Sequence, residues 1–408
     1  MKGFKPLNHA DAAALAAMLE VRPRWVKVAR AFEVIPFPGR ALLHAGPPVA
    51  CASELAVAVR HSALLAILYE GWADTREKAE ALLDAGTLGL YPAQDFCAAI
   101  PLADVLSPGM AVIVVEDALQ PSRRAFSTLN GGDGPVARVG VFDDAVLERL
   151  QWVNRELASH LSEWIEHQPL ELLPIADQAL AAGDDCHGMT RHASALLAAK
   201  WLGQGSALPL PEPVRSFLES SAAFFLNPWM AAVKCILQAA QGFEGSGVVT
   251  AIGGNGRQFG IQVAAWPGRW FTAPATPPLI PAASEALFKR SLGAIGDSAI
   301  VDAFGLGAMA ARYSPVTSQR LEQVCQEHGL QPPESLLTHV HPAFTESAPL
   351  RTGLSAFAVC ERGQSPVISL GVLDREGLQG RLDGGFYFCA RVPFETAVAQ
   401  LEALHETA

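Results

Sequence analysis

The chain has no uninterrupted apolar run of the roughly 18 residues that a helix needs to cross a bilayer, although half of its 408 residues are hydrophobic. Charged residues are sparse at 17 %, and the net charge of −11 is not gathered in a tail. His9 and Asp11 interrupt the N-terminal stretch, so it lacks a signal-peptide core. These absences argue against a disordered chain and against membrane or nucleic-acid partners, and we expect a cytoplasmic globular protein.

Several site motifs are also missing. The seven cysteines are scattered without a CxxC pair, which favours reduced, mostly buried thiols over a zinc or iron–sulfur site. The glycine-containing joints match neither GxGxxG nor a P-loop, and Ser298 lacks the GxSxG context of a hydrolase nucleophile. The sequence therefore predicts no cofactor, while a divalent metal stays open.

The length of the chain exceeds the roughly 250–300 residues at which a single core stops growing, so two or three domains are expected. The patterns predict a multidomain α/β protein. We expect an N-terminal α/β sheet domain over residues 1–142, a central helical domain over 143–244, and a mixed α+β domain over 245–408. No internal repeat is visible.

Periodicity places the main elements along the chain. Strands are expected over residues 40–44, 64–69, 88–91 and 110–116, and an amphipathic helix capped by Asp74 over 74–85. The central range predicts helices over 144–167 and 188–202, and a further helix capped by Asn227 with Pro228 at its first position. The last third predicts strands over 248–252, 258–264, 270–273 and 386–392, followed by a helix over 394–405.

The densest polar cluster lies between two predicted helices, where Asp184, Asp185 and His187 fall within four positions. Two carboxylates and an imidazole could hold a divalent cation or form an acid–base pair. The simpler alternative is that a carboxylate caps the helix that begins near Gly188, with His187 hydrogen-bonded at its start.

A second cluster combines a glycine-rich turn with two arginines. Asn255, Gly256 and Arg257 lie between two predicted strands, and Arg269 and Thr272 follow shortly after. Exposed backbone N–H groups and paired guanidinium groups could clamp a carboxylate or phosphate. An ordinary hairpin turn with solvated arginines explains the same residues equally well.

Other candidates lie at strand ends, where open α/β sheets bind ligands. His44 and Gly46 follow the first predicted strand, and Glu70 follows the second. Asp297 and Ser298 come after a glycine and could equally form a helix cap.

Seven strings in these regions resemble, in the same order, the family that contains the middle-sized subunit of oxamate carbamoyltransferase. The strings are LLHAGPP (42–48), YEGWA (69–73), FFLN (224–227), VTA (249–251), NGRQFGI (255–261), RWFTAP (269–274) and IGDSAI (295–300). The resemblance spans roughly residues 22–310. It implies one subunit of a multi-subunit system, with an FdrA-like protein and a small accessory subunit as partners. The implied reaction transfers a carbamoyl group from carbamoyl phosphate to oxamate.

This resemblance and the clusters above lead to one set of expected site residues. The expected catalytic residues are His187, Asp184 and Glu70, and the expected substrate-binding residues are His44, Gly46, Asn227, Asn255, Gly256, Arg257, Arg269, Thr272, Asp297 and Ser298. In the leading hypothesis Arg257 and Arg269 hold small anionic substrates, and backbone amides near Gly46 and Gly256 stabilise oxyanion charge. His187 or Glu70 moves a proton from the attacking amide nitrogen.

The sequence departs from the family pattern in its C-terminal hundred residues, where residues 380–386 replace a glycine-rich segment. This departure puts the acceptor substrate in question. Two other functions stay open: a non-catalytic scaffold for the FdrA-like partner, and a metal-dependent hydrolase of an amide or ureide built on Asp184, Asp185 and His187. The transferase predicts that Asp184, His187, Asn255 and Arg269 converge on one cleft, and a homo-oligomer is also left open.

Overall fold

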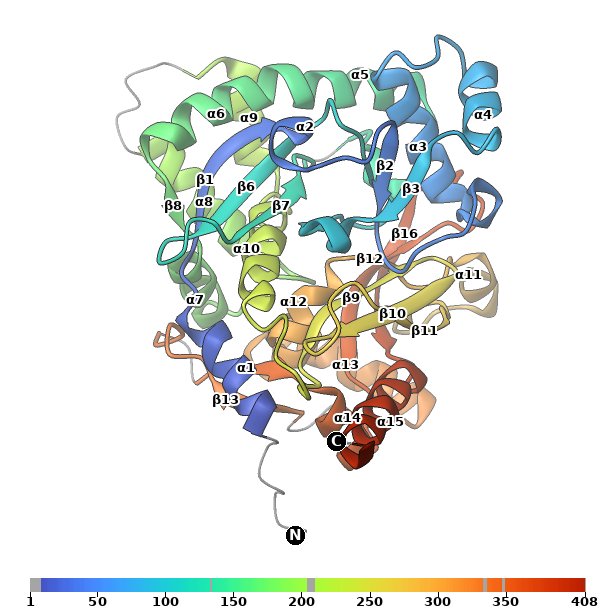
Figure 1. The fold of residues 1–408 in the computed structure, drawn as a ribbon. Coiled ribbons are helices and arrows are strands. Elements are labelled where there is room, and N and C mark those ends of the chain that lie inside the picture. The colour runs from blue at the N-terminus through green and yellow to red at the C-terminus, as the bar shows by residue number, and fades with distance from the viewer. Residues whose placement is uncertain (1–8, 133, 204–209, 333–335, 347–348, 408) are drawn as a thin grey trace.

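A computed structural model describes residues 9–132, 134–203, 210–332, 336–346 and 349–407. The chain is a mixed α/β protein, as predicted, with a five-stranded sheet from its first part and a four-stranded sheet from its last third. Figure 1 shows helix α10 (Leu226–Gln238) at the centre of the molecule, where it contacts strands of both sheets. No helix in the described ranges is long and apolar enough to cross a membrane.

The N-terminal region combines two small sheets with covering helices. Its helices are α1 (His9–Glu20), α2 (Ala31–Val34), α3 (Val57–Tyr69) and α4 (Arg76–Asp84), with short 3-10 turns η1 (Ala52–Glu54), η2 (Ala93–Phe96) and η3 (Ala137–Val139). Its strands are β1 (Pro23–Arg30), β2 (Ala41–His44), β3 (Gly89–Pro92), β4 (Ala98–Ala99), β5 (Val105–Leu106), β6 (Ala111–Asp117) and β7 (Arg124–Thr128). The larger sheet has the order β4-β7-β6-β1-β8, where β8 (Leu170–Glu171) comes from the central region. The smaller sheet has the order β3-β2-β5, with β2 and β3 parallel.

Two local predictions in this region are wrong. Residues 64–69 form the end of helix α3 rather than a strand. A short apolar run cannot distinguish a buried strand from a buried helix, and the alanine and leucine residues here favour the helix. Helix α4 is capped by Thr75, whose hydroxyl accepts from the Lys78 amide, while Asp74 forms an exposed ion pair with the Lys78 ammonium at 2.7 Å.

The central region is helical, as predicted, and adds one short strand to the first sheet. Its elements are α5 (Asp144–Trp152), a π-helical turn η4 (Val153–Leu157), α6 (Ala158–His167), β8 (Leu170–Glu171), α7 (Leu173–Ala181), α8 (Arg191–Gly203), α9 (Glu212–Ser220) and α10. Asn227 does not cap α10, because that helix already begins at Leu226. The Asn227 amide instead donates to the Thr128 carbonyl at 2.8 Å and ties α10 to strand β7.

The last third contains the four-stranded sheet β11-β10-β9-β12 and two separate strand pairs. Its strands are β9 (Val249–Asn255), β10 (Gln258–Val263), β11 (Phe271–Pro274), β12 (Ile295–Gly296), β13 (Leu337–Val340), β14 (Arg351–Leu354), β15 (Val367–Leu373) and β16 (Arg381–Phe388). Its helices are α11 (Glu285–Arg290), α12 (Ala299–Phe304), the 3-10 turn η5 (Gly307–Tyr313), α13 (Pro315–His328), α14 (Ala356–Arg362) and α15 (Val392–Thr407). The strand expected over 386–392 begins earlier, at Arg381, and ends at Phe388, and the C-terminal helix begins at Val392.

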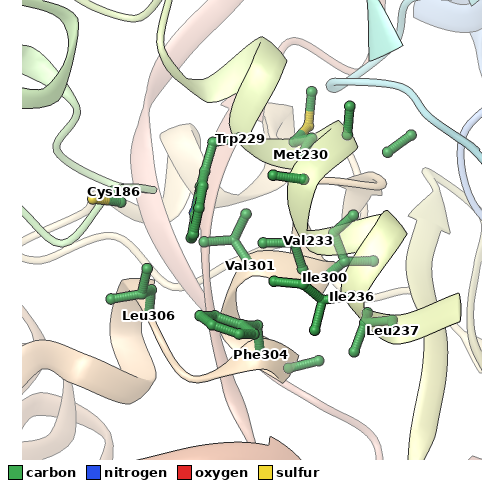
Figure 2. Close-up of a cluster of buried hydrophobic side chains, with 14 of the residues drawn as sticks. Cys186, Trp229, Met230, Val233, Ile236, Leu237, Ile300, Val301, Phe304 and Leu306 are labelled. Carbon is green, nitrogen blue, oxygen red and sulfur yellow. The ribbon is translucent and has the colours of Figure 1, made fainter. Parts of the chain in front are cut away.

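One large hydrophobic cluster connects these regions. Figure 2 shows Trp229 of α10 beside Val301 and Phe304 of α12, and the Trp229 and Phe304 rings meet edge to face at 5.8 Å. The same cluster includes Trp25 from β1. Residues from all three predicted domain ranges therefore share a core, and the boundaries at 142 and 244 stay a prediction.

Candidate functional site

The loop between α7 and α8 carries the polar cluster that the sequence singles out. One Asp184 oxygen accepts from the amides of His192 and Ala193 at 2.7 and 3.1 Å, and the other from the Cys186 amide at 2.9 Å. Burial raises the pKa of Asp184 to about 6. Asp184 therefore caps helix α8, which is the simpler of the two alternatives that the sequence leaves open.

Asp185 holds the rest of this loop in place. One of its oxygens accepts from the amides of His187 and Met189 at 2.9 and 3.0 Å, and the other accepts from the Thr317 hydroxyl of α13. Its carbonyl accepts from the Gly307 amide at 2.9 Å. Contacts from three segments thus determine where the His187 imidazole lies.

His187 forms a buried pair with Asp302 of α12. The His187 Nδ1 and an Asp302 oxygen are 2.5 Å apart, and both side chains are at most 4 % exposed. The other Asp302 oxygen accepts from the amides of Ala308 and Ser369 at 2.8 and 3.1 Å. Burial raises the pKa of Asp302, and the nearby His187 opposes this shift. Because Nδ1 is engaged, Nε2 is the ring nitrogen that remains for a ligand.

A glycine makes this pair sterically feasible. Gly307 has a φ of +57°, and a Cβ at this position would lie 2.3 Å from an Asp302 oxygen. Any larger residue would displace the carboxylate that orients His187.

His187 lines a cavity of about 390 Å³ between the central helices and strands β15 and β16. Asn227 at the start of α10 and Ser298 just before α12 line it as well. Three of the expected site residues therefore meet at one pocket, although 40 or more positions separate each from the next along the chain. A pocket of this size suits a small-molecule ligand.

The pocket wall is positively charged. Arg138, Arg320 and Arg381 all line it, and Asp383 is the one acidic residue among the described residues of the lining. Sequence reasoning missed these arginines and Asp302. The available signal was the expectation that residues 380–386 depart from the family pattern, since these residues include Arg381 and Asp383 of the wall.

Helix starts and a free hydroxyl complete the pocket. Thr190 immediately precedes α8, Asn227 lies in the first turn of α10, and Thr317 lies in the first turn of α13. The positive ends of these three helices favour an anion. The Ser369 hydroxyl is buried and has no hydrogen-bond partner in the described structure, and Ser369 lines the same cavity.

Asp297 and Gly46 belong to a different, sealed cluster. The Asp297 carboxylate accepts from the amides of Gly46 and Ile100 at 2.9 and 3.0 Å and from the Gln94 side chain at 2.8 Å. Burial raises the pKa of Asp297 to about 7. The buried Lys234 ammonium lies 3.4 Å from the Gln94 side-chain oxygen, and burial lowers its pKa. Because the Gly46 amide donates to Asp297, it is not available to stabilise an oxyanion.

The glycine-rich turn is a hairpin between β9 and β10. The Asn255 side chain accepts from the amides of Arg257 and Gln258 at 3.0 and 2.8 Å, and the Gly256 amide donates to the Ala294 carbonyl at 3.0 Å. Arg257 donates to backbone carbonyls of the 53–55 segment. These residues therefore use their polar groups within the protein.

Arg269 and Thr272 are exposed on the C-terminal sheet, and neither lines the pocket. The Arg269 guanidinium lies over the rings of Trp266 and Phe271 at 5.1 and 5.3 Å. Of the four side chains expected to converge, only His187 lines the cavity.

The remaining two candidates also lie outside the cavity lining. His44 is buried, its Nδ1 contacts the Ala45 carbonyl at 2.9 Å, and burial lowers its pKa. Glu70 accepts from the Ser107 hydroxyl and the Gly109 amide, each at 2.6 Å. No group of three or more His, Cys, Asp or Glu side chains in the described ranges is arranged to hold a metal ion.

Comparisons with known proteins agree with one another. A family model described as oxamate carbamoyltransferase subunit AllG matches residues 88–298, just over half of the chain. The oxamate carbamoyltransferase subunit AllG of Escherichia coli (strain K12) is 29 % identical over 433 aligned positions that cover 99 % of both proteins. The uncharacterized protein YahG of the same strain is 28 % identical and covers 75 % of this chain and 66 % of its own length. A crystal structure of a conserved protein of unknown function from Enterococcus faecalis V583 superimposes with a TM-score of 0.88 over 97 % of both chains at 26 % identity.

Proposed function

The chain belongs to the family of oxamate carbamoyltransferase subunit AllG, and from this premise we propose that it is a subunit of a carbamoyltransferase complex. Its substrates are carbamoyl phosphate and oxamate or a related small amide. Its partners are an FdrA-like protein and a small accessory subunit. Its place in metabolism is nitrogen or purine-derived catabolism, such as that of allantoin.

One observation carries this proposal: His187, which is paired with the buried Asp302, and three arginines line a single pocket. His187 supplies an imidazole nitrogen, and Arg138, Arg320 and Arg381 supply positive charge. Carbamoyl phosphate and oxamate are both small anions, which guanidinium groups and helix N-termini bind well. The pocket thus combines a proton acceptor with anion-binding groups, which carbamoyl transfer requires.

The reaction is a substitution at the carbonyl carbon of carbamoyl phosphate. The amide nitrogen of oxamate attacks this carbon, a new C–N bond forms, and the bond from the carbon to the phosphate oxygen breaks. Phosphate leaves with the electron pair, and the proton from the attacking nitrogen passes to Nε2 of His187. Asp302 stabilises the resulting imidazolium, as carboxylates do in other His–Asp pairs. The products are N-carbamoyl oxamate and phosphate.

The arginines and helix starts act on charge in this scheme. Guanidinium groups hold the substrates in the pocket and favour the departing phosphate. The starts of α8, α10 and α13 add partial positive charge to the same space. Ser369 offers a hydroxyl that no other group in the described structure uses.

A scaffold for the FdrA-like partner is the second candidate. The observation that favours it is that Asp184, Asn255 and Asp297 form hydrogen bonds with groups of the chain itself. A scaffold needs no free reactive groups, whereas the transferase requires His187 and the arginines to contact substrate.

Co-expression of the chain with its genomic neighbours tests the proposal. The measurement is phosphate release that depends on carbamoyl phosphate, across oxamate and related amides. We expect His187→Ala to lower turnover by roughly 10²- to 10⁴-fold, the contribution typical of a general base. His167→Ala is the matched control, because His167 is exposed at the end of α6.

Equal turnover of the two variants would reject the role of His187. A stable complex without turnover on any acceptor would favour the scaffold.

A further inference from the structure

Arg381 lies over a pair of glycines. Strands β15 and β16 pair Gly371 with Gly384, and neither glycine has a positive φ. A Cβ on Gly384 would lie 3.2 Å from an Arg381 terminal nitrogen, and a Cβ on Gly371 would lie 3.6 Å from the Arg381 Nε. A Cβ on Gly371 would meet the Leu102 side chain first, at 3.1 Å, whereas the Arg381 guanidinium is the only group within 4 Å of a Cβ on Gly384 among the described residues. The backbone of Gly384 would accept other residues, so the absence of a side chain there leaves room for the guanidinium.

A short segment of β16 anchors Arg381 together with Arg320. The Arg381 Nε donates to the Asp383 carbonyl at 3.1 Å. One Arg320 terminal nitrogen donates to the Gly384 carbonyl at 2.7 Å and to the Asp383 carboxylate at 3.3 Å. Each guanidinium has five N–H groups, and the two groups make no other hydrogen bond within the described ranges. Several donors at the pocket wall therefore remain for a ligand.

Asp383 is the internal counter-ion of Arg320 in this arginine pair. Its carboxylate is 42 % exposed, accepts from Arg320 at the long distance of 3.3 Å, and accepts from the Gly384 amide at 2.6 Å. A ligand carboxylate that binds between the two arginines would compete with Asp383 for the Arg320 guanidinium. The exposed, long contact is weak, so a ligand able to form a bidentate pair can replace it.

We propose that Arg381, supported by Arg320, selects the acceptor by binding its carboxylate, and that Asp383 sets how tightly that carboxylate is held. This inference rests on the proposed function, since it concerns the acceptor side of the same pocket. Gly384 leaves the space that the Arg381 guanidinium occupies, and Arg381 and Arg320 hold the acceptor on the wall formed by β16 and α13. The specificity-determining residues thus come from strand β16 and helix α13.

Binding of oxamate to the full chain tests this assignment by calorimetry, with uncharged oxamide as the comparison ligand. We expect Arg381→Gln to weaken oxamate binding roughly 10- to 100-fold, because a charge-assisted bidentate contact is lost. Arg391→Gln is the matched control, since Arg391 is an exposed arginine paired with Glu395 elsewhere on the C-terminal region. Oxamide should bind weakly to all three proteins.

Two further variants give effects of opposite sign. Asp383→Asn keeps an oxygen that can accept from the Gly384 amide but removes the competing charge, so oxamate should bind several-fold more tightly. Gly384→Ala should weaken oxamate binding, because its Cβ displaces the Arg381 guanidinium. Absence of oxamate binding by the unaltered chain would overturn the inference, and so would equal binding by the unaltered chain and Arg381→Gln.

Failure of the inference and failure of the proposed function give different results. If oxamate binding depends on Arg381 but the co-expressed complex transfers no carbamoyl group, the inference stands and the transferase proposal falls. If the complex turns over and Arg381→Gln leaves the KM for oxamate unchanged, the transferase stands and the inference falls.

Discussion

Two buried polar clusters lie close together in this protein and differ in what they leave unpaired. The open cluster consists of His187, Asp302, Asp185, Thr317 and Ser369, and it borders the pocket. The sealed cluster consists of Asp297, Gly46, Gln94, Ile100 and Lys234, and none of these residues lines that pocket.

Asp297 and Ser298 are adjacent in the sequence, but Asp297 belongs to the sealed cluster and Ser298 to the pocket lining. Both carboxylate oxygens of Asp297 accept hydrogen bonds inside the protein, whereas Ser298 lines the pocket. In the open cluster an imidazole nitrogen and the Ser369 hydroxyl remain for a ligand, while the sealed cluster satisfies its own groups. Polar residue type alone therefore does not identify a site, because a site needs polar groups that the fold does not satisfy.

The largest effect is expected from Asp302→Asn in the open cluster. The asparagine oxygen can still accept from the amides of Ala308 and Ser369, but its NH₂ would donate to His187 Nδ1. The imidazole would then carry its proton on Nε2 and could not accept one from the substrate. We expect kcat of the co-expressed complex to fall by roughly 10²- to 10⁴-fold with little change in thermal stability. A large loss of stability with unchanged kcat would place Asp302 among structural residues.

Gly46→Ala should have the next largest effect, on stability. Gly46 has a φ of +74°, and a Cβ there would lie 2.3 Å from the Gly254 backbone carbon. Backbone strain and overpacking together should lower the free energy of unfolding by about 3 kcal/mol or more. Gly39→Ala is the control, since Gly39 has a φ of +72° and none of the described residues would lie within 4 Å of its added Cβ. Equal urea-unfolding midpoints for the two variants would contradict the tight packing of the sealed cluster.

A smaller, pH-dependent effect is expected from Asp297→Asn. The folded pKa of Asp297, about 7, lies above its unfolded value, so the folded state holds this proton more tightly. That stabilisation is present at low pH and is lost as the pH rises through about 7. The unaltered protein should therefore lose about 2–3 kcal/mol of unfolding free energy relative to Asp297→Asn between pH 5 and pH 8. If the difference in thermal midpoint between the unaltered protein and Asp297→Asn is the same at pH 5 and pH 8, Asp297 is ionised in the folded protein at both pH values.

The smallest effect is expected from Ser369→Ala. Its hydroxyl has no hydrogen-bond partner in the described structure, so stability should change by less than about 1 kcal/mol. The KM for one of the substrates should rise roughly 3- to 10-fold, the equivalent of one ordinary hydrogen bond. Ser127→Ala is the matched control, because the Ser127 hydroxyl is also buried and unpartnered but Ser127 does not line the pocket. Identical KM values for the two variants would remove Ser369 from the site.

Much of the fold could be predicted locally, and the errors have local causes. The β9–β10 hairpin and the C-terminal helix follow from turn residues and periodicity. The sequence predicts a strand where helix α3 ends, because a buried apolar run shows no alternation of polar and apolar residues that would distinguish a helix from a strand. Asn227 has the residue type of a cap, but its amide bonds to Thr128, which lies 99 positions earlier.

The pocket was predicted only in part. His187, Asn227 and Ser298 were identified, yet the partner of His187 lies 115 positions away, and neither spacing nor periodicity connects the two. The arginines of the pocket come from three further segments, and the arginines that the sequence favoured, Arg257 and Arg269, lie outside it. The local sequence pattern could not distinguish the two groups, because an arginine that lines a pocket and an arginine outside it look the same in the sequence.

The sequence by itself determined the mixed α/β class, most helices and strands, the lack of a nucleotide or CxxC motif, and the resemblance that the family comparison confirms. These properties depend on composition and on residues near one another along the chain. Only the tertiary structure decided that Asp297 is sealed while Ser298 lines a cavity, and that Asp302 orients His187. Pairing and burial depend on which distant segments pack together, and that packing is set by the whole core rather than by any local pattern.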